Sequence, residues 1–183
     1  MKVVILVGGD GKRMGNKIKP LLKKKGKTVL SYIIDNLKKY DLNDIYLIIN
    51  NKKQFKKLEY KTVRDFKELR SVIKEDFLLL VGDSIINIDF KKLINFHNTN
   101  PAFATVVTSN YEIPYGTIDN GTFTEKPKQE VAIGIYILKP ENLKDYFYVP
   151  DMIGNFKTFK FEGEFVHITT FGDYQQWKKL SYW

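Results

Sequence analysis

In the first half of the chain, short continuous runs of apolar residues alternate with segments in which apolar residues recur at helical spacing. Residues 2–7 form a near-continuous apolar run, which is typical of a strand buried on both faces of a parallel sheet. Similar short runs predict strands at residues 44–49 and 77–81. Apolar positions that share one helical face, in places behind a capping aspartate, predict helices over residues 29–37, 54–58, 65–73 and 89–97. The first half is therefore expected to alternate strand and helix.

The second half carries shorter strand patterns that are separated by turn residues. Asn120-Gly121 lies between two of these patterns and is a strong hairpin signal. Gly163 lies near the turn between the last two. A short helical stretch is expected after Pro140 and a final helix over residues 173–180. The strands are expected at residues 102–108, 116–118, 122–124, 131–138, 158–161 and 164–169.

This order of elements predicts an α/β fold built as a three-layer sandwich. The expected sheet is mixed and mostly parallel, with a Rossmann-like N-terminal half and antiparallel hairpin additions from the second half. We expect residues 1–183 to form a single domain, which suits a chain of 183 residues. In such sheets the ligand lies at the carboxyl ends of the strands, where the pattern places residues 8–19 and 82–84.

Composition narrows the chemistry that this fold can carry. The chain has no cysteine and only two histidines, which excludes disulfides, thiolate metal sites, cysteine nucleophiles and multi-histidine zinc sites. The formal net charge of +9 fits a lysine-rich solvated surface, binding of anionic small substrates, or nucleic-acid binding. Because the aromatic residues mostly fall at core spacing, we expect no nucleic-acid partner.

The N-terminal segment gives no sign of export or of membrane insertion. It passes straight from the first apolar run into a glycine loop, without the cleavage region of a signal peptide. No apolar run approaches the ~20 residues that a membrane-spanning helix needs. We therefore expect a cytoplasmic protein with no membrane partner.

The loop after the first strand has the composition of a phosphate-binding loop. It contains Gly8, Gly9 and Gly11, followed by Arg13 and then by Lys19. Glycines let backbone N–H groups surround phosphate oxygens, and the two cations add contacts suited to a triphosphate. The structural alternative is a tight strand-to-helix turn whose cations face water.

Two other phosphate-binding motifs are excluded by single residues. The dinucleotide fingerprint needs a third glycine where this chain has Met14. The segment Gly26-Lys27-Thr28 ends like a P-loop, but Leu21 stands where the motif needs its first glycine. Gly26 is better interpreted as the turn before the helix that starts near Thr28.

A second loop, at the end of the strand over residues 77–81, supplies a carboxylate. Asp83 follows Gly82 there, opposite the glycine loop. A carboxylate in this position can hold Mg²⁺ against phosphates. The alternative is an aspartate that bonds only its own turn.

Beyond these two loops, ordered segments along nearly the whole chain resemble the sugar-nucleotide pyrophosphorylases, which have the nucleotide-diphospho-sugar transferase fold. The matching segments are LVGGDGKRM with IKPLL, EDFLLLVGDSIINIDFKKLINFH, YGTIDNGTFTEKP, AIGIYILKPENL and FVHITTFGDYQQW. The resemblance implies an enzyme that transfers a nucleoside monophosphate from a nucleoside triphosphate to a sugar 1-phosphate and releases pyrophosphate. It implies Mg²⁺, or Mn²⁺, as the cofactor and no protein nucleophile.

The resemblance also assigns roles to individual residues. Arg13, Lys19 and Asp83 are the expected catalytic residues, and Asp83 is the expected metal ligand. Residues 1–100 would form the nucleotide- and metal-binding half and residues 101–183 the sugar-phosphate-binding half. The full expected set is Leu6, Gly8, Gly9, Asp10, Gly11, Lys12 and Arg13 for the nucleotide, and Gly116, Glu125, Lys126 and Gly134 for the sugar phosphate.

The closing segment departs from the family at the metal site. An aspartate usually completes the site, and alignment through Asp173 puts His167 at that position. Imidazole is a poorer Mg²⁺ ligand than carboxylate but suits Mn²⁺ and other transition metals. Three interpretations stay open: His167 binds a different metal, Asp83 acts alone, or His167 is a plain strand residue.

Two further departures leave other functions open. Residues 61–68 contain no glycine where the family often has a glycine-rich base-reading loop. The stretch between Arg13 and Lys19 is short, which resembles molybdenum-cofactor guanylyltransferases and alcohol-phosphate cytidylyltransferases. The alternatives are therefore a nucleotidyltransferase with molybdopterin or an alcohol phosphate as acceptor, or a catalytically weakened nucleotide-binding regulatory subunit. The base, the sugar and the oligomeric state are not predicted.

Overall fold

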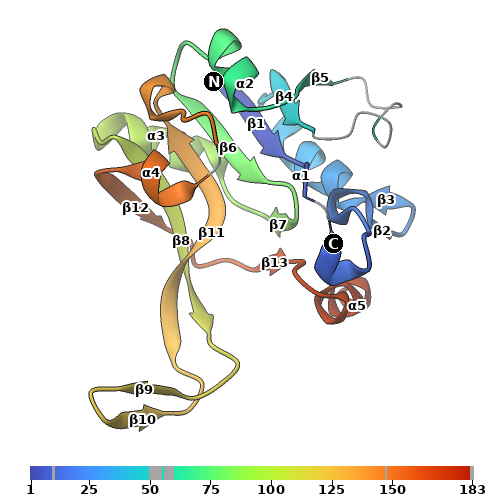
Figure 1. Cartoon of the computed structure of the whole chain (residues 1–183), viewed down its shortest axis with the longest axis vertical. Helices are drawn as coiled ribbons and strands as arrows, with labels where there is room; N and C mark the ends of the chain where they lie inside the picture. Colours follow the sequence, from blue (N-terminus) through green and yellow to red (C-terminus); the bar gives the residue numbers. More distant parts are fainter. Residues whose placement is uncertain (10, 50–54, 56–59, 147, 182–183) are drawn as a thin grey trace.

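The structure is a computed structural model. It describes residues 1–9, 11–49, 55, 60–146 and 148–181, with Arg13 described through its backbone. The predicted helix over residues 54–58 falls, apart from Phe55, outside the described residues. Figure 1 shows a central sheet with helices on both sides and a long two-stranded ribbon that projects from one end.

Seven strands form the central sheet, in the order β12-β8-β11-β6-β1-β4-β5. Strand β11 runs antiparallel to both of its neighbours, and every other pairing in the sheet is parallel. A mostly parallel sheet with an antiparallel addition from the second half is therefore confirmed. The strands are β1 (Lys2–Leu6), β4 (Ile45–Ile48), β5 (Lys61–Val63), β6 (Phe77–Val81), β8 (Ala104–Glu112), β11 (Lys128–Leu138) and β12 (Phe156–Lys160).

Helices cover both faces of the sheet and give three layers. Because side chains alternate along a strand, Val3 and Ile5 of β1 join one apolar core and Val4 joins the other. Helices α1 (Val29–Lys38), α3 (Phe90–Thr99) and α5 (Phe171–Lys179) pack into the first core. Helices α2 (Phe66–Val72) and α4 (Val149–Ile153) pack into the second. None of the helices among the described residues is both long and apolar enough to cross a membrane.

Four of the helices begin at a residue whose side-chain oxygen accepts a hydrogen bond from the first turn. Thr28, Asp65 and Asp89 each accept a hydrogen bond from a backbone N–H in the first turn of α1, α2 and α3. Thr170 and Asp173 form a reciprocal capping box at the start of α5. These bonds satisfy N–H groups that the helix itself leaves unpaired.

The remaining strands form three small antiparallel pairs: β2 (Lys23–Lys24) with β3 (Lys27–Thr28), β7 (Ser84–Ile86) with β13 (Phe165–His167), and β9 (Thr117–Asp119) with β10 (Thr122–Thr124). The predicted Asn120-Gly121 hairpin is confirmed as the turn between β9 and β10. The two strands expected around Gly163 do exist, but they do not pair with each other. One lies parallel to β8 at the sheet edge, and the other pairs with β7 far along the chain.

A buried lysine fastens the last helix to the β2–β3 hairpin. Lys24 is 3 % exposed, and its Nζ donates to the backbone oxygens of Trp177 at 2.8 Å and Leu180 at 2.7 Å. The ammonium also lies 5.4 Å from the centre of the Trp177 ring. Burial lowers the pKa of Lys24, and the nearby charge of Lys25 lowers it further. The carbonyls at the end of α5 offset this desolvation.

Lys24→Met should destabilise the protein because it leaves two carbonyl oxygens at the end of α5 without a donor. The expected loss in the free energy of unfolding is about 1–3 kcal/mol. Chemical denaturation monitored by tryptophan fluorescence measures it, and Lys23→Met, at an exposed position on the same hairpin, is the control. Equal stability of the two variants would contradict the anchoring role of Lys24.

Candidate active site

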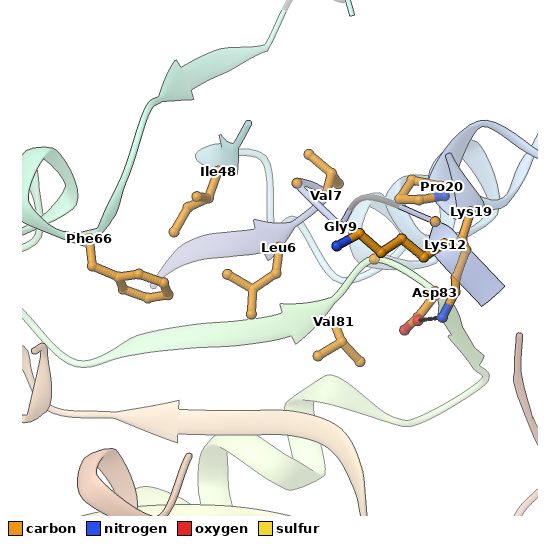
Figure 2. A pocket seen from close by; sticks show the side chains of 13 residues that line it. Leu6, Val7, Gly9, Lys12, Lys19, Pro20, Ile48, Phe66, Val81 and Asp83 are labelled. Atoms are coloured by element: carbon orange, nitrogen blue, oxygen red, sulfur yellow. Dashed lines mark hydrogen bonds and ion pairs between the residues drawn. The ribbon is translucent and has the colours of Figure 1, made fainter. Parts of the chain in front are cut away.

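A cavity of about 520 Å³ lies at the carboxyl ends of β1 and β6. These strands are parallel neighbours with Leu6 opposite Val81, so the loops that follow them meet at one edge of the sheet. The volume lies within the range of small-molecule sites in proteins. The cavity is lined by Leu6, Val7, Gly8, Gly9, Gly11, Lys12, Lys19, Pro20, Ile48, Phe66, Val81, Gly82 and Asp83 (Figure 2).

Most of the residues expected to bind nucleotide share this cavity. They are Leu6, Gly8, Gly9, Gly11 and Lys12, and the expected catalytic residues Lys19 and Asp83 line the cavity with them. Asp10 lies outside the described residues. The backbone of Arg13 lies in the short 3₁₀ helix η1 (Lys12–Met14), directly after the glycine loop. The two predicted loops are thus brought together as expected.

An ion pair joins the two loops across the cavity. Lys19 Nζ lies 2.9 Å from Asp83 Oδ2, and each side chain is 20 % exposed (Figure 2). Lys19 opens the 3₁₀ helix η2 (Lys19–Leu21), where Pro20 fixes the backbone angle. Gly82 donates its backbone N–H to Leu6 O at 2.8 Å, and a Cβ at Gly82 would collide with that oxygen. The glycine before Asp83 therefore lets the two strand ends approach closely.

The other end of the cavity is apolar. Leu6, Ile48 and Phe66 line it on the side away from the Lys19–Asp83 pair (Figure 2). The sequence predicts Ile48 in a strand and Phe66 on the apolar face of a helix. Neither pattern indicates that the residue lines a ligand site. Because β4 ends at the same sheet edge, Ile48 reaches the cavity. Phe66 reaches it as the first residue of α2.

Strand β13 brings His167 beside Asp83. The β7–β13 pairing places His167 opposite Ser84, and Ile168 donates its backbone N–H to Asp83 O at 2.9 Å. His167 Nδ1 lies 2.6 Å from Ser84 Oγ and 3.7 Å from Asp83 Oδ1. Ser84 lies in the predicted loop of residues 82–84, but the sequence analysis assigns its side chain no role. Its position directly after Asp83 was the available signal.

A second cavity of about 640 Å³ meets the first at Val81, which lines both. Strand β11, strand β13 and helix α5 supply most of its wall. Gly134, predicted for the sugar phosphate, lines this cavity together with His167. The described lining residues include no lysine or arginine: they are Val81, Tyr111, Val131, Ala132, Ile133, Gly134, Tyr136, Phe165, Val166, His167, Thr169, Asp173, Gln176, Trp177 and Leu180.

The other three residues predicted for the sugar phosphate lie elsewhere. Gly116, Glu125 and Lys126 flank β9 and β10 at the end of the projecting ribbon (Figure 1). Glu125 and Lys126 are exposed, and none of the three lines either cavity. The ring of Phe123 packs against Gly116. The structure thus separates these residues from Gly134.

The donor atoms around Asp83 fit a divalent cation that is held jointly with a phosphate ligand. Among the described residues no three His, Cys, Asp or Glu side chains gather as a metal site. Asp83 offers Oδ1, while Oδ2 contacts Lys19, and His167 offers an adjacent imidazole. Mg²⁺ is commonly bound by one or two carboxylates plus substrate phosphates, so this sparse donor set is compatible with it.

Comparison with known proteins gives the family. The nucleotidyl transferase model matches residues 60–153, slightly more than half of the chain, and the MobA-like NTP transferase domain model matches residues 3–73. This chain belongs to the nucleotidyl transferase family.

Individual relatives and a solved structure agree with this assignment. A mannose-1-phosphate guanyltransferase of Yarrowia lipolytica is 31% identical over 180 residues, which cover 76% of this chain and 50% of that protein. The "Probable glucose-1-phosphate cytidylyltransferase" of Bacillus subtilis is 29% identical over 201 residues, covering 82% of this chain and 78% of that protein. The crystal structure of HddC from Yersinia pseudotuberculosis complexed with GMP-PN has the same fold, with a TM-score of 0.73, 22% identity and 97% of each chain covered.

Gly134→Ala should destabilise the fold more than an alanine at an equally strained glycine elsewhere. Gly134 has φ +79° in an irregular part of β11, and an added Cβ would collide with Val81. Gly121 also has φ +79°, but an added Cβ there would meet open space. We expect Gly121→Ala to cost about 1 kcal/mol from backbone strain alone. Gly134→Ala should cost roughly 1–3 kcal/mol more, because it overpacks the strand that leads to Asp83.

Chemical denaturation of the two glycine variants measures this difference. The pair shares the backbone angle, so the extra cost isolates the steric contact with Val81. Equal losses would mean that β11 shifts to accept the methyl group, and that the second cavity does not depend on glycine at this position.

Proposed function

We propose that this chain transfers a nucleoside monophosphate from a nucleoside triphosphate to a sugar 1-phosphate and releases pyrophosphate. The observation that carries the proposal is the Lys19–Asp83 pair in the first cavity, where Asp83 Oδ1 lies 3.7 Å from Nδ1 of His167, a residue that lines the second cavity. A group transfer between two bound substrates needs adjoining sites with charged side chains at their boundary. Membership of the nucleotidyl transferase family supports the same reaction.

In this proposal the nucleotide occupies the cavity at the ends of β1 and β6. The triphosphate lies along the loop of Gly8, Gly9 and Gly11, with Arg13 and Lys19 as cationic contacts. The base lies toward the apolar end at Ile48 and Phe66, next to Leu6. A nucleotide that spans the cavity in this direction places its phosphates beside Asp83.

The acceptor occupies the second cavity, between β11 and α5. Gly134 there leaves the space that a Cβ would take from Val81. The lining is largely apolar, so the phosphate of the acceptor needs a cation from outside the cavity wall. Lys126, with Glu125 and Gly116 on the ribbon, is our candidate for that contact, and it requires the ribbon to approach the cavity. In this scheme residues 1–100 bind nucleotide and metal, and residues 101–183 bind the acceptor.

The reaction is an in-line displacement at the α-phosphorus. An oxygen of the acceptor phosphate forms the new P–O bond, the bond to the bridging oxygen breaks, and pyrophosphate leaves with its electron pair. Arg13 and Lys19 stabilise the charge that gathers on the leaving phosphates. The chain has no cysteine, and the proposal needs no protein nucleophile.

A divalent metal is part of this proposal. Asp83 is its principal ligand on the chain, and His167 is the second candidate, 3.7 Å from Asp83 Oδ1. Mg²⁺, when bound, would neutralise charge on the phosphates. A carboxylate and an imidazole side by side also suit Mn²⁺, so both ions belong in any assay.

The base and the sugar are not shared among the relatives. Their names include guanyl, cytidylyl and uridylyl transfer, to mannose 1-phosphate and to glucose 1-phosphate. The chain also spans about half the length of the Yarrowia lipolytica protein. The proposal is therefore limited to the reaction type and the sugar 1-phosphate class.

A second candidate keeps the nucleotide and changes the acceptor. The MobA-like model matches residues 3–73, which hold the nucleotide loop, and the loop between Arg13 and Lys19 is short. A molybdopterin or an alcohol phosphate is the acceptor in that case. A nucleotide-binding regulatory subunit is the third candidate, motivated by His167 in place of a carboxylate.

A pyrophosphate-release assay separates these candidates. Each common nucleoside triphosphate is combined with each of a panel of sugar 1-phosphates, first in Mg²⁺ and then in Mn²⁺. We expect release that requires one nucleotide and one sugar phosphate. Nucleotide binding without release across the sugar panel would contradict the proposal. Release with an alcohol phosphate or molybdopterin would then establish the second candidate.

Asp83→Asn should lower kcat by at least about 100-fold, because a neutral amide cannot replace the carboxylate beside the phosphates. The melting temperature should stay within a few degrees of the wild type. The control is Asp35→Asn, which breaks a similar but exposed ion pair with Lys27 at 2.8 Å, away from both cavities. Steady-state kinetics of the three proteins test the assignment. Unchanged turnover in Asp83→Asn would remove Asp83 from the mechanism.

A further inference from the structure

The two carboxylate oxygens of Asp83 have different neighbours. Oδ2 lies 2.9 Å from Lys19 Nζ (Figure 2), and Oδ1 lies 3.7 Å from His167 Nδ1. Because the ammonium of Lys19 engages Oδ2, the oxygen that remains for a cation is Oδ1. A metal ion bound through Oδ1 therefore lies on the side of Asp83 that the imidazole occupies.

The distance between Oδ1 and Nδ1 suits two ligands of one metal ion. Carboxylate oxygen and imidazole nitrogen bind a metal at about 2.0–2.2 Å, so two such ligands lie roughly 2.9–3.5 Å apart when they subtend an octahedral or tetrahedral angle. The observed separation is 3.7 Å, and the side chain of His167 is 47 % exposed. A small rotation of this half-exposed ring closes the remaining gap.

Ser84 determines which nitrogen of His167 carries the hydrogen. Ser84 is 4 % exposed, and its Oγ lies 2.6 Å from His167 Nδ1. A buried hydroxyl needs an acceptor for its hydrogen, and Nδ1 is the one side-chain partner that the described residues give to Ser84 Oγ. Ser84 therefore donates to Nδ1, and the ring hydrogen lies on Nε2. In this tautomer Nδ1 has the lone pair that a metal requires.

Backbone pairing holds these groups together. His167 lies opposite Ser84 in the β7–β13 pair, and the N–H of Ile168 donates to the backbone oxygen of Asp83 at 2.9 Å. Side chains carried on paired strands keep a more precise geometry than side chains on loops. The imidazole is thus placed beside Asp83 by the fold itself.

An imidazole in this position affects which ion the site prefers. Mg²⁺ favours oxygen ligands in near-ideal octahedral geometry, whereas imidazole nitrogen favours first-row transition metals. Among the described residues no third His, Asp or Glu joins Asp83 and His167 as a metal site. Nitrogen is therefore half of the ligand set that these side chains offer, and it has a large influence on the choice of metal.

We propose that Asp83 Oδ1 and His167 Nδ1 together hold a first-row transition-metal ion such as Mn²⁺ in preference to Mg²⁺, and that Ser84 is the positioning residue for His167. The inference rests on the proposed function for the presence of a metal at Asp83. When the ion binds, it takes the place of the Ser84 hydrogen at Nδ1. The hydroxyl has by then kept the ring in the tautomer and orientation that the ion needs.

Mn²⁺ binding to the protein without substrates tests the metal preference. Electron paramagnetic resonance counts the unbound Mn²⁺, and competition with Mg²⁺ gives the affinity for Mg²⁺. We expect His167→Ala to weaken Mn²⁺ binding at least about 10-fold and to change Mg²⁺ binding much less. His167→Asp should shift the preference toward Mg²⁺, because it supplies a second carboxylate. Equal Mn²⁺ affinity in the wild type and His167→Ala, or an equal loss for both ions, overturns the proposal.

Pulsed electron paramagnetic resonance of bound Mn²⁺ tests direct ligation by the imidazole. With isotope-labelled histidine, we expect a histidine-nitrogen coupling in the wild type that disappears in His167→Ala. The chain has one other histidine, His97, which is 5 % exposed and contacts Asp76 and Thr105 through its two ring nitrogens. The signal is therefore specific for His167. Bound Mn²⁺ without a histidine coupling overturns the proposal.

Ser84→Ala tests the positioning role. Loss of a group that orients a metal-binding histidine typically costs 10–100-fold in metal affinity, so we expect Mn²⁺ binding to weaken about 10-fold. Ser84→Thr keeps the hydroxyl and should restore most of it. Ser109→Ala is the control, because it removes another buried serine, 5 % exposed, that lines neither the first nor the second cavity. Unchanged affinity in Ser84→Ala, or an equal loss in Ser109→Ala, overturns the role of Ser84.

These measurements are independent of turnover, because no nucleotide or acceptor is present. A protein that releases pyrophosphate but whose Mn²⁺ affinity ignores His167→Ala retains the proposed function and loses this inference. A protein that binds Mn²⁺ through His167 but releases no pyrophosphate in any combination of substrates retains the metal site and loses the proposed function.

Discussion

The ion pair between Lys19 and Asp83 is the constraint on which the rest of the site depends. It joins two loops that lie 64 residues apart in the sequence, and it does so at 2.9 Å with both side chains largely shielded from water. The partial shielding matters because attraction between charges is stronger where water is excluded. The sheet supplies the geometry: β1 and β6 are parallel neighbours, so both loops leave the same edge.

Much of the fold follows from periodicity in the sequence. The apolar runs at β1, β4 and β6 and the capped helices α1, α2 and α3 are predicted close to their observed bounds. Strands β2, β3 and β7 are not predicted, because two or three residues without a recognised hairpin turn or a longer apolar pattern leave no periodic signal. Strand β12 pairs with β8, and β13 pairs with β7. Both partners lie far away along the chain, so the local pattern of residues gives no information about them.

The candidate site likewise contains some residues that a local sequence signal predicts and others that it does not. The glycine loop, Lys19 and Asp83 are predicted because glycines and charges directly after a buried strand are a local signal. The contact between Ser84 and His167 and the apolar wall at Ile48 and Phe66 are not predicted, because they depend on strand register and helix placement. The roles of His167, Glu125 and Lys126 come from a resemblance. The structure places His167 beside Asp83, and Glu125 and Lys126 at the end of the projecting ribbon.

The position of β11 has a consequence for how the chain matures during translation. The first cavity is lined by residues between Leu6 and Asp83, whereas the second cavity needs residues as late as Leu180. At about 5–20 residues per second, the ribosome completes the first lining some 5 to 20 seconds before the second. Until β11 inserts between β6 and β8, the edge of β6 beside the loop of Asp83 lacks its partner. Under the proposed function, nucleotide bound in this interval would contact Val81 and Asp83 and so stabilise β6 while its edge is open.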